Sequence, residues 1–67
     1  MILSLRQAII QRVHDKSADE LIQVIDESIG GDDKALPGLG VLFELIWENS
    51  NPEAKSSMAA TLKEHLT

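Results

Sequence analysis

Apolar residues recur along this chain at spacings of three and four positions, and strict alternation of apolar and polar residues never persists. This periodicity is typical of amphipathic helices and argues against strands. We expect one all-α domain over residues 1–67, a small bundle of about four short helices at roughly 2–14, 18–29, 39–49 and 52–66. The first helix carries its apolar stripe on Leu5, Ile9 and Val13, and Ile2 extends that stripe toward the N-terminus.

The ends of two further helices are marked by residues that satisfy backbone groups. Ser17 and Glu20 have the spacing of a capping box, in which each side chain accepts a hydrogen bond from the backbone amide of the other residue. Gly30, followed by a second glycine, predicts the end of that helix, because glycine readily adopts the left-handed conformation common there. Asn51 followed by Pro52 predicts the start of the fourth helix.

The third segment is the most apolar part of the chain. Pro37 restricts Leu36 toward extended backbone, so we expect a connection as far as Gly38 and a helix from Leu39 onward. Apolar residues occupy nearly the whole circumference of this helix, which predicts a central position with neighbours on several sides. Two thin amphipathic helices and a weak fourth cover it poorly, and a homodimer is one way to complete the core. The residues expected in the core or at an interface are Leu39, Leu42, Phe43, Ile46 and Trp47.

Arg6 is the charged residue that a helical wheel places inside the apolar stripe of the first helix. Its methylene stem can lie along the edge of the core while the guanidinium reaches water. Alternatively, it forms a structural ion pair with an acid on another helix. The third helix, otherwise apolar, carries Glu44 and Glu48. We predict a pair between Arg6 and Glu44, with Glu48 as the alternative partner, because a charge in apolar surroundings needs a partner.

The composition excludes several kinds of functional site. The chain has 67 residues and no cysteine, so a disulfide framework, a cysteine-based zinc site and a thiol nucleophile are all excluded. His14 and His65 have no acid or second histidine at metal-ligand spacing, and Asp32 and Asp33 lack the ligand pattern of a calcium loop. We therefore expect no catalytic residue, no enzymatic activity, no cofactor, no metal ion and no small-molecule substrate.

Charge and hydropathy argue against nucleic acid and membranes as partners. Asp and Glu number 11 against 6 Lys and Arg, a net charge of -5, whereas binding to phosphate backbones or anionic lipid requires clustered basic residues. A helix-turn-helix is disfavoured, because its recognition helix would present Glu44 and Glu48 to the phosphates. No apolar run approaches the roughly 20 residues that cross a bilayer. We expect no specific nucleic-acid partner and no membrane partner.

Two stretches of the chain resemble a known protein family. The block LPGLGVLFELIW from Leu36 to Trp47, and the opening LRQAII from Leu5 to Ile10, are similar to the minor small, acid-soluble spore proteins of type I from endospore-forming Bacillus-like bacteria. The resemblance implies a protein without enzymatic activity, made in the forespore and kept in the cytoplasmic compartment of the spore core.

Three hypotheses about function follow from the residues and the resemblance together. The leading one is a small non-enzymatic protein of the sporulation programme that acts by packing, storage or contacts with an unknown spore-core protein. The alternative is a homodimeric helical interaction module without nucleic-acid binding. A third is weak association with spore DNA, which predicts a salt-dependent mobility shift. The leading hypothesis rests on the family block rather than on any site, whereas the homodimer rests on the apolar surface of the third helix.

Overall fold

The computed structural model of the chain describes residues 4–66 and confirms the all-α prediction, with no strand in this range. The predicted stripe residue Ile2 lies outside the described residues. The helix ends fall within one or two residues of the predicted ones, except at the starts of the first and third helices; the first begins at Leu5, three residues after the predicted start. The elements in chain order are α1 (Leu5–Val13), α2 (Ala18–Ser28), the short 3₁₀ helix η1 (Asp33–Ala35), α3 (Leu36–Glu48) and α4 (Pro52–Glu64).

Capping boxes begin both of the first two helices. In α2 the Ser17 hydroxyl accepts from the Glu20 amide at 3.2 Å, and the Glu20 carboxylate accepts from the Ser17 amide at 3.1 Å, as predicted. In α1 the same arrangement joins Ser4 and Gln7, with distances of 3.1 Å and 3.0 Å. Each box satisfies two backbone amides at a helix start, where no preceding turn is available to do so.

The start of α3 differs from the prediction. Leu36 has helical backbone angles, φ -59° and ψ -44°, and is already the first residue of α3. The expected extended Leu36, and the expected connection through Gly38 with a helix start at Leu39, are therefore wrong. The physical reason lies in Pro37, which is the second residue of the helix. Amides of the first turn have no partner within a helix, so a proline there removes no hydrogen bond.

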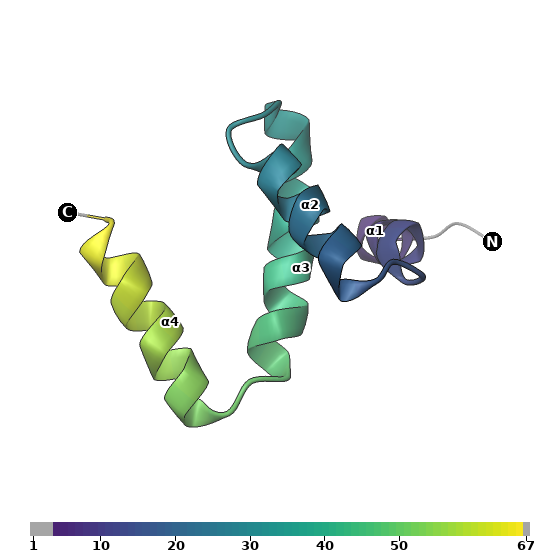
Figure 1. Ribbon diagram of the computed structural model, residues 1–67. Helices are drawn as coiled ribbons and strands as arrows, with labels where there is room; N and C mark the ends of the chain where they lie inside the picture. The colour runs from purple at the N-terminus through teal and green to yellow at the C-terminus, as the bar shows by residue number, and fades with distance from the viewer. Residues whose placement is uncertain (1–3, 67) are drawn as a thin grey trace.

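The helix α3 is central, because α1, α2 and η1 all pack against it, whereas α4 makes only sparse contact with the other elements. Figure 1 shows α4 leaving the end of α3 and running away from it, so that the two helices form an open V. Among residues 4–66 only Val41 is a buried apolar residue, at 8% exposure. Phe43 and Ile46, predicted in the core or at an interface, are half-exposed and so are not core residues. The reason is that α1 docks on the side of α3 that carries Val41 and Glu44.

Candidate functional site

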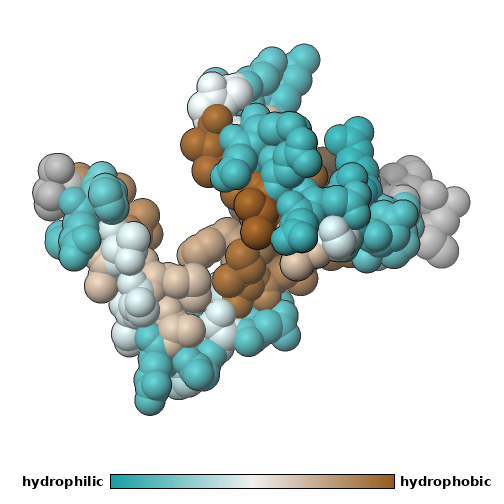
Figure 2. Space-filling model, viewed as in Figure 1, coloured by the Kyte–Doolittle hydropathy of each residue, from teal (hydrophilic) through white to brown (hydrophobic). Residues whose placement is uncertain are grey.

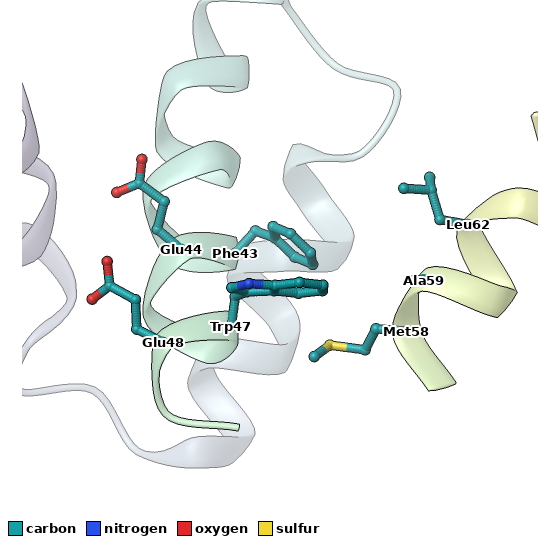
Figure 3. A pocket seen from close by; sticks show the side chains of 7 residues that line it. All are labelled: Phe43, Glu44, Trp47, Glu48, Met58, Ala59 and Leu62. Atoms are coloured by element: carbon teal, nitrogen blue, oxygen red, sulfur yellow. The ribbon is translucent and has the colours of Figure 1, made fainter. Parts of the chain in front are cut away.

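The opening between α3 and α4 is an apolar cleft, which we call the notch. Its volume is about 270 Å³. Phe43 and Trp47 of α3 point across it toward Met58 and Leu62 of α4, as Figure 3 shows. The residues that line the notch are Phe43, Glu44, Trp47, Glu48, Met58, Ala59 and Leu62.

Helical spacing builds both walls of the notch. Phe43 and Trp47 are four residues apart on α3, so their rings stack along one face, with centroids 5.7 Å apart and planes tilted by 40°. Met58 and Leu62 have the same spacing on α4. The start of α4 is fixed by Asn51, whose side-chain oxygen accepts a hydrogen bond from the backbone amide of Ala54 at 2.7 Å, as the Asn-Pro signal predicted.

The two walls face each other without closing on each other. Phe43 is 48% exposed and Leu62 is 55% exposed. The ammonium of Lys55 lies 5.7 Å from the centroid of the Trp47 ring, a cation–π contact that joins α4 to α3 near their connection. Beyond that contact the helices diverge, and Figure 2 shows apolar residues along the side of the molecule that faces the opening. The notch is therefore apolar surface that the chain itself leaves in water.

A second apolar depression lies where α1, α2 and α3 meet, and we call it the α2 hollow. Its volume is about 410 Å³. Ile22 at its rim is 59% exposed, and Ile46 is 48% exposed. The apolar residues that line it are Ile10, Val13, Ala18, Leu21, Ile22, Ile25, Leu42, Leu45 and Ile46. The predicted core or interface residues of α3 are thus divided, with Phe43 and Trp47 in the notch and Leu42 and Ile46 in the α2 hollow.

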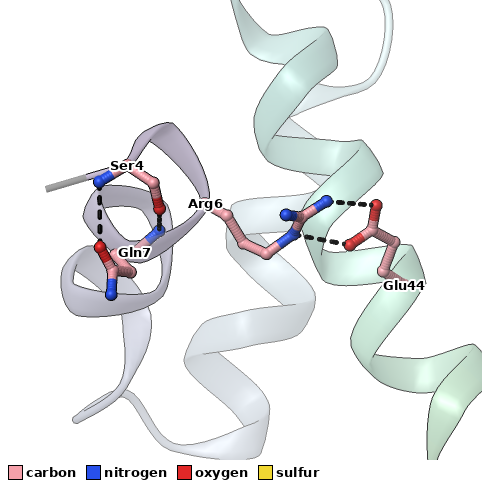
Figure 4. A network of polar contacts seen from close by, with 4 residues as sticks. All are labelled: Ser4, Arg6, Gln7 and Glu44. Atoms are coloured by element: carbon pink, nitrogen blue, oxygen red, sulfur yellow. Dashed lines mark hydrogen bonds and ion pairs between the residues drawn. The ribbon is translucent and has the colours of Figure 1, made fainter.

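Arg6 and Glu44 lie together, and their ion pair joins α1 to α3 (Figure 4). Arg6 Nε donates to one carboxylate oxygen at 2.9 Å, and Nη2 donates to the other at 3.0 Å. Both side chains are well exposed. The hydrogen bond from Arg6 holds the pKa of Glu44 below its ordinary value. The pKa of Arg6 is raised by this hydrogen bond and by the charge of Glu44, and more weakly by the charge of Glu48. This two-point contact fixes the register of α1 on α3.

Sequence reasoning missed two residues of this region. Val41 is not among the residues predicted in the core or at an interface, yet it is buried beside Leu5 and Arg6 of α1. Ser4 was not predicted as a cap, although a serine followed three residues later by Gln7 is the sequence signal of a capping box. That signal could have fixed the start of α1 from the sequence.

The histidines and acids form no recognisable catalytic or metal-binding geometry within residues 4–66. His14 Nδ1 lies 2.8 Å from the carbonyl of Gln11 in its own helix, and His65 follows the end of α4. No group of three His, Cys, Asp or Glu side chains in the described range could hold a metal ion. No described helix is long and apolar enough to cross a membrane. The notch and the α2 hollow differ from the other depressions of the described surface in their strongly apolar lining.

The helices and these two apolar surfaces define a small, acidic, all-α protein with little buried core. A family model described as "Small, acid-soluble spore protein I" matches residues 3–66. Proteins named small, acid-soluble spore protein I are 45% identical in Bacillus licheniformis and 43% in Geobacillus kaustophilus. The first comparison covers 98% of this chain and 96% of the relative, and the second covers 96% and 94%. A relative in Bacillus mycoides is 43% identical, with 98% and 97% covered.

The chain therefore belongs to the small, acid-soluble spore protein I family, which confirms the resemblance found in the sequence. The family places it in the sporulation programme and in the spore. No solved structure matches the chain.

Proposed function

We propose that this protein is a non-enzymatic component of the spore core that acts through contacts with other protein chains. The sequence leaves packing, storage and protein contacts open as modes of action, and the exposed apolar surface supports protein contacts. Exposed apolar surface is costly to keep in water, and large contiguous patches of it mark sites of association. The observation that supports the proposal is that two apolar depressions, the notch and the α2 hollow, stay open on a chain with one buried apolar residue in the described range.

The surface charge supports protein rather than nucleic acid as the partner. The net charge is -5, and α2 carries four acids and no basic residue in its sequence ADELIQVIDES. Such a face repels phosphate groups. The six basic residues are spread along the chain, from Arg6 on α1 to Lys63 on α4, and Arg6 is already held by Glu44. A mobility shift at low ionic strength would overturn this part of the proposal.

The test is made in spores of the source organism. The native gene is replaced by a Leu62→Glu variant, which puts a charge in the wall of the notch, and the spores are compared with a deletion strain for heat resistance and outgrowth. Ile29→Glu is the matched control, because Ile29 is at least as exposed as Leu62, at 65% against 55%, and lines neither the notch nor the α2 hollow. Protein levels are measured in each strain.

We expect Leu62→Glu to reproduce the deletion strain and Ile29→Glu to behave as wild type. Leu62→Glu spores that behave as wild type, beside defective deletion spores, would show that the notch does not serve the function.

A further inference from the structure

We infer that the partner in the notch is a second copy of this chain. The α3–α4 hairpins of two copies pack face to face about a two-fold axis, and each α3 lies beside the partner's α4. This inference rests on the proposed function and names the partner of the same surface. The large exposed area of the chain, the equal lengths of α3 and α4 and the charges beside the notch support it.

The chain exposes far more surface than a folded monomer of its mass. A monomer of 7.4 kDa is expected to expose roughly 4,200 Å², and this chain exposes 5680 Å². The radius of gyration is 13.4 Å, against about 11 Å for a compact domain of this length. The excess is about 1,500 Å² per chain. Two chains that each bury this excess form an interface of about 3,000 Å², which lies within the range of obligate homodimers.

The two arms of the V are suited to pack against their own copies. The helices α3 and α4 have 13 residues each, and a short connection at residues 49–51 joins them. Hairpins of two matched helices with one apolar face can pair into a four-helix bundle, with the apolar faces of all four helices inside. The apolar face that each hairpin turns inward is the lining of the notch. A two-fold arrangement covers both notches at once and leaves neither copy with an open one.

The charges beside the notch favour an arrangement in which α3 packs against the partner's α4 rather than against the partner's α3. On α3 the acids beside the notch are Glu44 and Glu48, and because Glu44 is already paired with Arg6 of α1, Glu48 carries the charge that is not compensated. On α4, at about 100° per residue, Lys55 lies on the same side as the apolar lining and Lys63 lies at its edge. The acids of α4, Glu53 and Glu64, fall on the opposite side. Packing α3 against the partner's α3 would bring acids together, whereas packing it against α4 brings acids beside lysines.

The α2 hollow is the less suitable surface for a second copy. Lys16 lines this hollow, but the charges of α2 at its edge are the acids Asp19 and Asp26, and the helix has no basic residue; Glu20 and Glu27 fall on the opposite side. A two-fold contact through this hollow would bring the acidic faces of two α2 helices together, and like charges at a contact are repelled. The notch is therefore the surface on which a second copy meets complementary charges.

The test is the mass of the purified full-length chain in solution, measured by sedimentation equilibrium from micromolar to millimolar concentration. Trp47 is the single tryptophan of the chain and lies in the notch, so its fluorescence reports on the same event. We expect a dimer, and a shift of Trp47 emission to shorter wavelength over the concentration range in which the dimer forms. A strict monomer at all concentrations would overturn the inference.

Variants locate the interface. Leu62→Glu should raise the dissociation constant by about 10-fold or more, while Ile22→Glu in the α2 hollow should leave it within about twofold. Lys63→Glu should also weaken the dimer, and adding Glu48→Lys should restore it. Circular dichroism shows whether Leu62→Glu keeps its helix content. If it does not, the charge variants Lys63→Glu and Glu48→Lys still test the interface. A dimer that Ile22→Glu disrupts and the notch variants do not would overturn the inference.

The two proposals can fail separately. If the chain is a strict monomer and Leu62→Glu still reproduces the deletion phenotype in spores, the second copy is excluded and the proposed function stands with another protein in the notch. If the chain dimerises through the notch and Leu62→Glu spores behave as wild type, the dimer stands and the proposed function is excluded.

Discussion

Replacing Gly40 by alanine should stabilise the protein, although this glycine lies within the block Leu36–Trp47 on which the family resemblance rests. Gly40 is the fifth residue of α3, inside the helix, where glycine costs about 0.5–1 kcal/mol relative to alanine because the unfolded chain loses more freedom. A Cβ atom added at Gly40 would have no neighbour within 4 Å. The substitution therefore reduces the conformational entropy lost on folding and introduces no steric clash.

The size of the effect can be measured by thermal unfolding, followed by circular dichroism at one protein concentration. For a domain of this length about 1 kcal/mol corresponds to roughly 4–8 °C, so we expect Gly40→Ala to raise the Tm by about 2–8 °C. The matched control is Gly30→Ala. Gly30 has φ of 75°, in the left-handed region that costs an alanine about 1–2 kcal/mol, so this variant should lower the Tm.

Two results would refute this reasoning. If Gly40→Ala lowers the Tm, then another segment approaches α3 closely at Gly40, and the open space beside it in this structure is not open in solution. If both variants raise the Tm, the left-handed turn after α2 is not formed.

Three further predictions concern the caps, the ion pair and the notch. Ser17→Ala removes the acceptor that begins α2 and should cost about 1 kcal/mol, measured by chemical denaturation. Because the folded pKa of Glu44 lies below its ordinary value, the contribution of its pair with Arg6 is present above the ordinary pKa and is lost as pH falls through the lowered one. The Tm difference between wild type and Glu44→Gln should therefore vanish in acid and shrink in high salt; a constant difference would contradict the pair. At concentrations where the chain is monomeric, Phe43→Ala should cost about 2 kcal/mol by chemical denaturation, below the 3–5 kcal/mol of a fully buried phenylalanine, because Phe43 is 48% exposed in the single chain.

Local signals in the sequence predicted the helices well, and their spatial arrangement poorly. The capping box at Ser17, the glycine after α2 and the Asn51 cap each depend on a few neighbouring residues, so the sequence is sufficient to place them. The start of α3 was missed because the rule for residues before proline competes with the tolerance of proline in a first helical turn. At Leu36 the second effect is the stronger one.

The periodicity of the sequence could not predict which apolar residues of α3 are covered and which stay exposed. A helix that is apolar nearly all round gives no preferred side, so the sequence could not indicate that α1 would cover Val41 and leave Phe43 exposed. The sequence signal that did predict a contact between helices was the placement of charged residues. An arginine in one apolar stripe and an acid on another apolar helix led to a specific pairing, and the structure places Arg6 and Glu44 together.

The net charge of the chain gives a last prediction, about the salt dependence of the inferred dimer. Each copy carries a net charge of -5, so association brings two acidic chains together against a repulsion that acts over a Debye length of about 8–10 Å at moderate salt. The exposed Glu and Lys pairs beside the notch contribute little, since such pairs are typically worth about 0–1 kcal/mol. Burial of apolar surface in the notch does not depend on screening in this way.

Added salt should therefore strengthen the dimer, because it screens the long-range repulsion more than it weakens the stabilising contacts. Sedimentation equilibrium of the wild-type chain in increasing sodium chloride measures this directly, and the dissociation constant should fall. The Lys63→Glu variant serves as the control: it carries a more negative charge, so its dissociation constant should be higher at low salt and should fall more steeply. A dimer that weakens as salt is added would be held by its ion pairs, and the assignment of the notch as an apolar interface would be wrong.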